Sequence, residues 1–286
     1  MFCRSSTGVF TLAAALMVTI VSAQAADDAR YPNWKGQWYA VKPGLGGQTV
    51  KFDPTKAFGP AQQAPLTPEY QKVLEDSMAD QAKGGLGNNP PAWCLPGGMP
   101  RMMVATTQEY VITPETTYIL LGTEYRRIFT DGRDWPDPEE VEPTYAGYSI
   151  GKWVDTNGDG RYDMLKVDTR GPFKGPRIYD STGLPLAFDN QSTFKERFHL
   201  DKTNPNLLHD EITVFDHALT RPWSVDQTLR RNPKPHPNWR QTYCTESNVN
   251  IVIGKENYFL SADGFLMPAK KDQAPPDSRY FKQLGK

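Results

Sequence analysis

The sequence predicts a mainly β fold, either an antiparallel calycin-like β-barrel or a β-sandwich, with one covering helix at about residues 67–83. Runs of β-branched and aromatic residues recur along most of the chain, with turn-forming residues between them. Only one segment has the apolar spacing of a helix. About ten strands with a single helix favour a barrel or a sandwich.

The expected strands are short and follow one another closely. Two of them, 116–121 and 123–130, have one residue between them and predict a hairpin. Residues 84–102 and 231–239 are rich in Gly or Pro, so we expect them to form surface loops or covers. The full set of expected strands is 36–41, 109–113, 116–121, 123–130, 147–153, 163–169, 193–200, 207–215, 224–230, 240–246 and 250–254.

The expected helix begins with Thr67 as its cap, followed by Pro68 and Glu69 in the first turn. It ends before Gly84 and Gly85. Its apolar residues define one face, which we expect to lie over the side or the mouth of the β structure. These apolar residues are Tyr70, Val73, Leu74 and Met78.

The N-terminus predicts export. Arg4 is followed by an apolar run from Val9 to Val21 and by small residues up to Ala25. The apolar run is about 13 residues long, shorter than the roughly 20 that a membrane-spanning helix needs. We therefore expect a signal peptide at 1–25 and a single β-rich domain at 26–286, with about fifteen loose residues at its end, in the periplasm or secreted.

Charge and cysteine content limit the partners of this domain. The formal net charge of −1 does not predict binding of nucleic acid or of an anionic membrane. After export the chain keeps Cys94 and Cys244, and an oxidising compartment favours a disulfide between two lone thiols. A reactive thiol or a metal ligand is the alternative, but neither cysteine has a second Cys or a His at ligand spacing.

A nine-residue loop, Asp155 to Asp163, has the spacing of a calcium-binding loop. Oxygen donors alternate along it, and Gly160 at the sixth position permits the turn. The loop lies between two expected strands and has Lys166 at its twelfth position, so it resembles the hairpin calcium loops of β-propellers and not an EF-hand. A solvated turn without metal is the alternative. The candidate ligands of a structural Ca²⁺ are Asp155, Asn157, Asp159, Arg161 and Asp163.

Two further patterns concern the inside of the expected barrel. Gly36-Gln37-Trp38 opens the first strand, and a G-x-W there is typical of lipocalins, in which the Trp closes one end of the barrel. An ordinary aromatic core is the alternative. In 193–200 and 207–215 the apolar faces include Glu196 and Asp210, and a carboxylate on an inward face needs a partner or becomes protonated. Arginines in 124–127 and at 133 are candidate partners, either in a ligand pocket or in a structural ion-pair network.

Some chemistries have no motif here. The chain has no G-x-S-x-G, no nucleotide-binding glycine loop and no paired-cysteine metal site. The four histidines, at 199, 209, 217 and 236, have no metal-ligand spacing. We therefore expect no nucleotide cofactor.

Five segments of the chain carry a further signal: Cys94–Met103, Arg126–Arg133, Pro143–Trp153, Ala218–Trp223 and Tyr243–Asn248. Together they resemble a family of exported bacterial proteins of unassigned function. That family typically has a shorter turn after Trp153, so the Asp155–Asp163 loop is an insertion here, and it carries histidines where this chain has Asp134-Trp135 and Leu186-Ala187. The resemblance implies no activity.

These observations predict an exported barrel that binds a small apolar or aromatic molecule. The candidate ligand-binding residues are Trp38, Tyr125, Arg127 and Phe129. The alternative is a cofactor-free hydrolase, lyase or isomerase acting on such a molecule, with Asp131, Arg133, Tyr145, Tyr148 and Glu196 as acid, base or charge stabiliser. A scaffold protein is a third possibility, for which a filled barrel without a pocket would be the sign. The sequence leaves the oligomeric state open.

Overall fold

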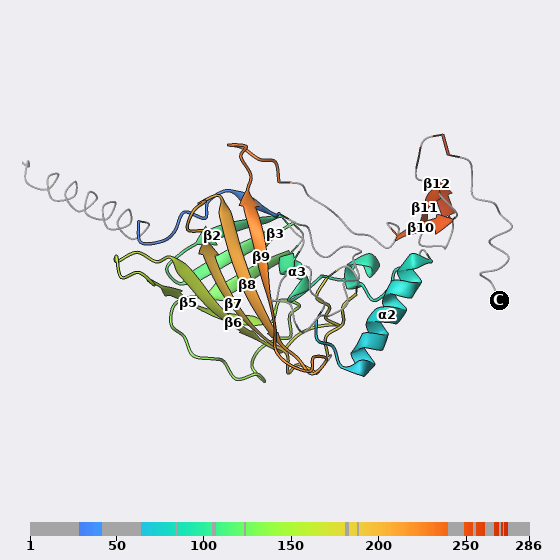
Figure 1. The fold of residues 1–286 in the computed structure, drawn as a ribbon, viewed down its shortest axis with the longest axis horizontal. Coiled ribbons are helices and arrows are strands. Elements are labelled where there is room, and N and C mark those ends of the chain that lie inside the picture. The colour runs from blue at the N-terminus through green and yellow to red at the C-terminus, as the bar shows by residue number, and fades with distance from the viewer. Residues whose placement is uncertain are drawn as a thin grey trace, which may run out of the picture.

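The fold is a closed β-barrel of nine strands, accompanied by a separate three-stranded sheet (Figure 1). It is taken from a computed structural model. The structure describes residues 29–41, 64–83, 85–104, 107–122, 124–180, 183–187, 189–239, 249–253, 256–260, 266–268, 270 and 272–273. The barrel strands are β1 (Gln37–Ala40), β2 (Gln108–Ile112), β3 (Thr116–Leu121), β4 (Glu124–Phe129), β5 (Tyr148–Val154), β6 (Met164–Arg170), β7 (Thr193–Leu200), β8 (Leu207–Phe215) and β9 (Trp223–Arg231).

The predicted barrel is confirmed, and every barrel strand ends within one residue of its expected bounds. Neighbouring strands pair in chain order, and β1 pairs with β9 to close the sheet. The pairing differs from the expected antiparallel one at a single place. There β4 and β5 are parallel, with Ile128 opposite Ser149 and Phe129 opposite Ile150. The last residues of β4 pair with the first residues of β5, so the connection at 130–147 brings the chain back beside the end of β4 and β5 continues in the same direction.

The second sheet lies late in the chain. Its strands are β10 (Val249–Ile253), β11 (Glu256–Leu260) and β12 (Leu266–Pro268), all antiparallel. Only β10 was predicted as a strand, because β11 and β12 are short and lack a long β-branched run. The strand expected at 240–246, the signal peptide and the expected loose C-terminal end fall largely or wholly outside the described residues.

Helix α2 (Pro68–Ala82) confirms the predicted helix. The Thr67 hydroxyl accepts a hydrogen bond from the Tyr70 amide, at 3.4 Å, as expected of the cap. Leu74 is buried on the inner face, whereas Val73 faces solvent. The Thr67 amide donates to the Ala218 carbonyl at 2.8 Å, which attaches the start of the helix to the connection between β8 and β9. Figure 1 shows the helix outside the barrel, on the side where the connecting loops gather.

The segment expected to form a cover contains two short helices, η1 (Pro90–Trp93) and α3 (Arg101–Val104). Met99, Met102 and Met103 are buried beside the barrel. Cys94 follows η1, but Cys244 lies outside the described residues, so their disulfide stays a prediction. None of the described helices is long and apolar enough to cross a membrane.

Alternate side chains of the barrel strands point inward, as the period of two requires. On β7 and β8 the buried residues include Phe194, Phe198, Leu208 and Ile212. Aromatic rings close both ends: Trp34 and Trp38 where β1 begins, and the Tyr179–Trp223 pair, with ring centroids 4.4 Å apart, at the other end. The described barrel is therefore a packed core and not an open cup.

Candidate functional site

A buried ion pair crosses the barrel interior. Arg126 on β4 donates to both carboxylate oxygens of Glu196 on β7, at 2.7 and 2.5 Å. Its guanidinium also donates to the hydroxyls of Ser149 and Thr169, at 3.2 and 2.7 Å. Glu196 faces inward as predicted, and among the candidate arginines it is Arg126 that pairs with it. Because both charged groups have well-aligned partners, the pair costs less to bury than an isolated charge would.

Asp210 on β8 is buried in the same interior without such a partner. Its side chain is 0 % exposed, and neither carboxyl oxygen has a hydrogen-bond partner among the described residues. Burial, followed by the nearby charge of Glu196, raises the pKa of Asp210 well above its usual value. The structure therefore favours the neutral carboxylic acid at this position.

Tyr110 on β2 is buried close enough to Asp210 and Glu196 for their carboxyl groups to affect it. Burial raises the pKa of its phenol well above the usual value, and the nearby carboxyl groups of Asp210 and Glu196 add to this effect. The hydroxyl donates to the side-chain carbonyl of Gln108, whose amide donates to the Met103 carbonyl at 2.9 Å. Tyr110 is therefore a neutral group held in place by a hydrogen-bond chain.

A pocket of about 390 Å³ lies at the end of the barrel where β1 begins. We call it the end pocket; it is lined by residues 31–35 and 110–112. Its inner wall includes Trp34, whose ring lies 5.3 Å from that of Tyr110 and 4.9 Å from that of Trp153, measured between centroids. Tyr31, Val111 and Ile112 add further apolar surface, while Asn33 and Lys35 are exposed polar residues of the lining.

Arg231 at the end of β9 positions the 33–35 wall of the end pocket. Its guanidinium lies 4.2 Å from the centre of the Trp38 ring and donates to the carbonyls of Asn33, at 2.7 Å, and Lys35. Trp38 is fully buried, and its indole donates to the Trp34 carbonyl at 2.9 Å. The predicted ligand-binding residue Trp38 thus supports the wall of the end pocket and does not line it.

The predicted calcium loop holds the chain just before the end pocket. The Tyr162 amide donates to the Arg30 carbonyl at 2.7 Å, and the Arg161 side chain donates to the Ala29 carbonyl at 3.1 Å. The ring of Tyr31 lies 5.3 Å from that of Tyr162. The loop therefore fixes one side of the end pocket through contacts that the sequence did not reveal.

The oxygen atoms of this loop bind its own backbone. Asp155 accepts from the amides of Gly158 and Gly160, at 2.7 and 2.8 Å, and the Gly160 bond is the first cause that lowers the pKa of Asp155. Asp163 accepts from the amide and hydroxyl of Thr156, at 3.0 and 2.5 Å. Asn157 and Asp159 accept from the amides two residues later. Among the described residues, no group of three His, Cys, Asp or Glu gathers as metal ligands would, so Ca²⁺ stays a prediction.

Four of the predicted residues come together on the outer face of the barrel, between β4 and β5. Arg133 donates to both carboxylate oxygens of Asp131 and to the Tyr148 hydroxyl, the latter at 3.3 Å. Its guanidinium also lies 3.8 Å from the centre of the Phe129 ring. Trp135 joins the cluster, with its ring 6.1 Å from that of Tyr148. This outer cluster is open to solvent, because Asp131 and Arg133 are both exposed.

The remaining predicted residues lie apart from both sites. Tyr125 is 62 % exposed on the outer face of β4, with the guanidinium of Arg127 5.7 Å from its ring centre. The Tyr145 carbonyl accepts from the Met99 amide at 3.0 Å in the covering segment. Candidate residues that are close in the sequence are thus divided between the inside and the outside of the barrel.

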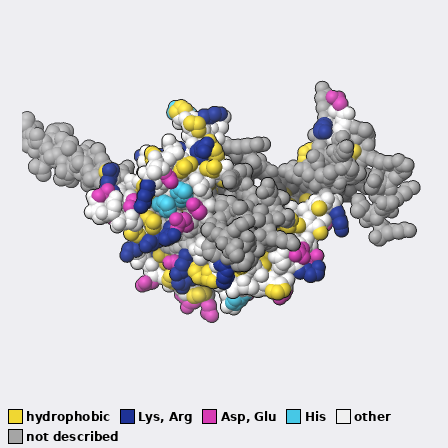
Figure 2. Space-filling view, in the orientation of Figure 1, with side chains coloured by type: hydrophobic (Ala, Val, Ile, Leu, Met, Phe, Trp, Pro, Cys, Tyr) yellow, Lys and Arg dark blue, Asp and Glu magenta, His cyan; other side chains and the backbone are white. Residues whose placement is uncertain are grey.

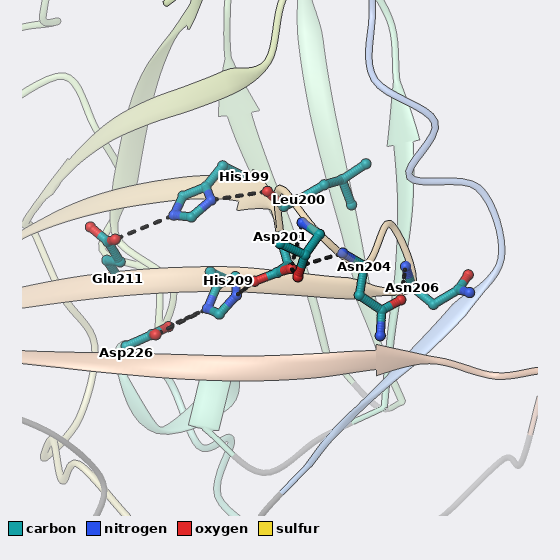
Figure 3. A network of polar contacts seen from close by, with 9 residues as sticks. His199, Leu200, Asp201, Asn204, Asn206, His209, Glu211 and Asp226 are labelled. Atoms are coloured by element: carbon teal, nitrogen blue, oxygen red, sulfur yellow. Dashed lines mark hydrogen bonds and ion pairs between the residues drawn. The ribbon is translucent and has the colours of Figure 1, made fainter.

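A polar network covers the outer face of β7, β8 and β9 (Figure 3). His199 contacts Glu211 at 3.2 Å, and His209 contacts both Asp226, at 3.0 Å, and Asp201, at 3.3 Å. The two imidazole rings are stacked, with centroids 5.1 Å apart. Figure 2 shows histidine side chains grouped with acidic and basic ones on this face. A shallow groove of about 310 Å³ lies beside them, lined by Lys195, Arg197, Glu211, Thr213, Ser224, Val225 and Asp226.

This outer network is built from charges that satisfy one another. Arg197 pairs with Glu211, and the hydroxyls of Thr213 and Ser224 share a hydrogen bond of 2.7 Å. Surface ion pairs of this kind contribute little to stability individually. We therefore assign the network a structural role that connects three strands.

No protein-family model matches this chain, and neither a curated protein nor a solved structure matches it. Sequence reasoning missed Tyr31, Lys35 and Tyr110 as pocket residues. The signal for Tyr110 was its inward position in β2, but the closeness of residues 31–35 to β2 comes only from the closed barrel.

Proposed function

We propose that this chain is an exported β-barrel protein that binds a small apolar or aromatic molecule in the end pocket. The observation that carries the proposal is the pocket itself, with its volume of about 390 Å³ and its aromatic and aliphatic walls. Small-molecule sites usually occupy roughly 300–1,000 Å³ and combine apolar walls with a few polar groups. The end pocket has both properties.

The alternative, a cofactor-free enzyme, has less support from the geometry. Glu196 is fully engaged by Arg126 and is not available as an acid or base. Asp131, Arg133 and Tyr148 meet in the outer cluster, which is exposed and gives no enclosed site for a substrate. The end pocket, in contrast, combines apolar walls with a defined volume, as a binding site requires.

Export, the Cys94–Cys244 disulfide and a structural Ca²⁺ belong to this proposal as well. The loop from Asp155 to Asp163 offers hard oxygen ligands of the type that Ca²⁺ prefers. By its contacts with Ala29 and Arg30, a metal held there would stabilise the chain that leads into the end pocket.

A fluorescence titration with 2-acetylnaphthalene tests the binding proposal. Trp34 lines the end pocket, so binding there is expected to change tryptophan emission. Two variants address the walls: Tyr31→Ala removes an aromatic wall, and Val111→Trp fills the pocket from a position that is 48 % exposed. Tyr39→Ala is the matched control, because Tyr39 is exposed on β1 and does not line the pocket.

We expect saturable binding by the unmodified protein and by the control variant. Loss of one aromatic contact should weaken binding about tenfold in Tyr31→Ala. Val111→Trp should abolish it while the protein remains folded, since the new side chain extends from an exposed position. Absence of binding to the unmodified protein, or equal binding by all variants, would refute the end pocket as the site.

A further inference from the structure

The backbone carbonyls on one wall of the end pocket are all in use. This wall is formed by residues 32–35, which lead into β1. Each of its four carbonyls already accepts a hydrogen bond from within the protein. The pairs are Pro32 with the Trp34 amide at 3.0 Å, Trp34 with the Trp38 indole at 2.9 Å, and Asn33 and Lys35 with the Arg231 guanidinium. A ligand group that donates hydrogen bonds therefore finds these acceptors occupied.

The polar side chains of this wall present donors. Asn33 uses its side-chain carbonyl to accept from the Lys35 amide at 3.2 Å, which leaves its NH2 group to donate. Lys35 has an ammonium group, which carries three donors and no acceptor. Both side chains are exposed, and both residues line the end pocket. The wall therefore favours a ligand whose polar group only accepts hydrogen bonds.

The same wall carries positive charge that no acidic side chain neutralises within the described part of the chain. Among the described residues that line the end pocket, Lys35 is the only charged one. Behind it, the Arg231 guanidinium donates to backbone carbonyls, and no described Asp or Glu lies within ion-pair distance of either cation. Glu109, the acidic residue of β2, accepts from the Gln37 side chain and does not line the pocket. The end pocket therefore favours a negatively charged group.

We propose that the ligand of the end pocket is an aromatic carboxylate, whose ring system lies against Trp34 and whose carboxylate is bound by Lys35 and Asn33. The inference rests on the proposed function and specifies its ligand class. Trp34 is buried at the inner wall, whereas Lys35 and Asn33 are exposed. The aromatic body can therefore leave water while the carboxylate stays at the solvent boundary, where it avoids the cost of burying a charge.

Two probes of nearly equal shape separate this inference from the proposed function. The first, 2-naphthoate, has a carboxylate, and the second, 2-acetylnaphthalene, has a neutral methyl ketone in its place. Their dissociation constants are measured by calorimetry at pH 7.5 in low salt, on the unmodified protein and on three variants. Lys35→Met removes the charge and Lys35→Arg keeps it. Lys152→Met is the matched control, because it removes an equal charge from an exposed position on β5 that does not line the pocket. Both positions are exposed, so all three variants are expected to fold.

We expect the unmodified protein to bind 2-naphthoate about fivefold more tightly than the ketone. Lys35→Met should lose that preference and keep its affinity for the ketone, whereas Lys35→Arg and Lys152→Met should retain the preference. Added salt should reduce the preference, because salt screens an exposed ion pair.

Three results would contradict this account at different levels. Equal affinities of the unmodified protein for the two probes, or tighter binding of the ketone, would overturn the carboxylate inference and leave the pocket proposal standing. An unchanged preference in Lys35→Met would overturn the role of Lys35. Failure of the unmodified protein to bind either probe would refute the proposed function, and the inference with it.

Discussion

Replacing Asp210 by Asn should make the protein more stable, by an amount that grows with pH. The folded protein holds the Asp210 proton because burial raises its pKa, whereas the unfolded chain releases it near the ordinary value of about 3.9. Between that value and the higher folded pKa, the folded state binds more protons than the unfolded state. The free energy of unfolding therefore falls as pH rises through this window.

The size of the effect follows from linkage. Each pH unit within the window costs the folded protein about 1.4 kcal/mol. The cost accumulates at this rate only until the folded pKa of Asp210 is passed, so from pH 4 to pH 7 it cannot exceed about 4 kcal/mol. Asp210→Asn has the same shape and no titrating proton, so it does not bear this cost.

Urea unfolding at pH 4.5, 5.5, 6.5 and 7.5 measures the difference between the two proteins. Comparing the variant with the unmodified protein at each pH cancels the titration of other groups that the substitution leaves unchanged. We expect the stability gain of Asp210→Asn to rise from pH 4.5 upward and to level off only above the raised folded pKa of Asp210. A gain that does not change across this range would refute the conclusion that Asp210 is a buried neutral acid.

Three further predictions concern the ion pair, the pocket wall and the loop. Arg126→Ala leaves the Glu196 carboxylate buried without its cation, so urea unfolding should show a free energy of unfolding lower by about 3–5 kcal/mol. A decrease below about 1 kcal/mol would contradict the burial of the pair. Arg231→Met removes the cation over Trp38 and two hydrogen bonds to the wall of the end pocket. It should lower the free energy of unfolding by about 1–3 kcal/mol and weaken 2-acetylnaphthalene binding. Unchanged affinity would show that Arg231 does not position the wall. If the Asp155–Asp163 loop holds Ca²⁺, saturating calcium at 100 times its Kd should stabilise the protein by about 2.7 kcal/mol over a chelated sample, and equal melting temperatures would refute the metal.

The sequence predicted the barrel strands well because they obey a period of two, but it left open whether they form a barrel or a sandwich. The same pattern placed Glu196 and Asp210 on inward faces, where the structure has them. It did not identify their partners, because Arg126 and Glu196 are brought together only by closure of the barrel. Nor did it predict the parallel pairing of β4 and β5, which depends on the path of the connection at 130–147.

The site was harder to predict than the fold. The aromatic and charged residues chosen from 125–148 are close in the sequence, but the structure turns most of them outward. The end pocket is formed instead by residues 31–35 and 110–112, which are far apart in the chain. Local spacing contains no information about such contacts, because they are set by the pairing of β1 with β2 and by the fixed position of Trp34.

The most direct test of the central claim is a crystal structure of the protein grown with 2-acetylnaphthalene. We predict electron density for the ring system between Tyr31 and Val111, against Trp34. Density for the molecule in the outer cluster or in the groove of β7–β9, with the end pocket unchanged, would contradict the account.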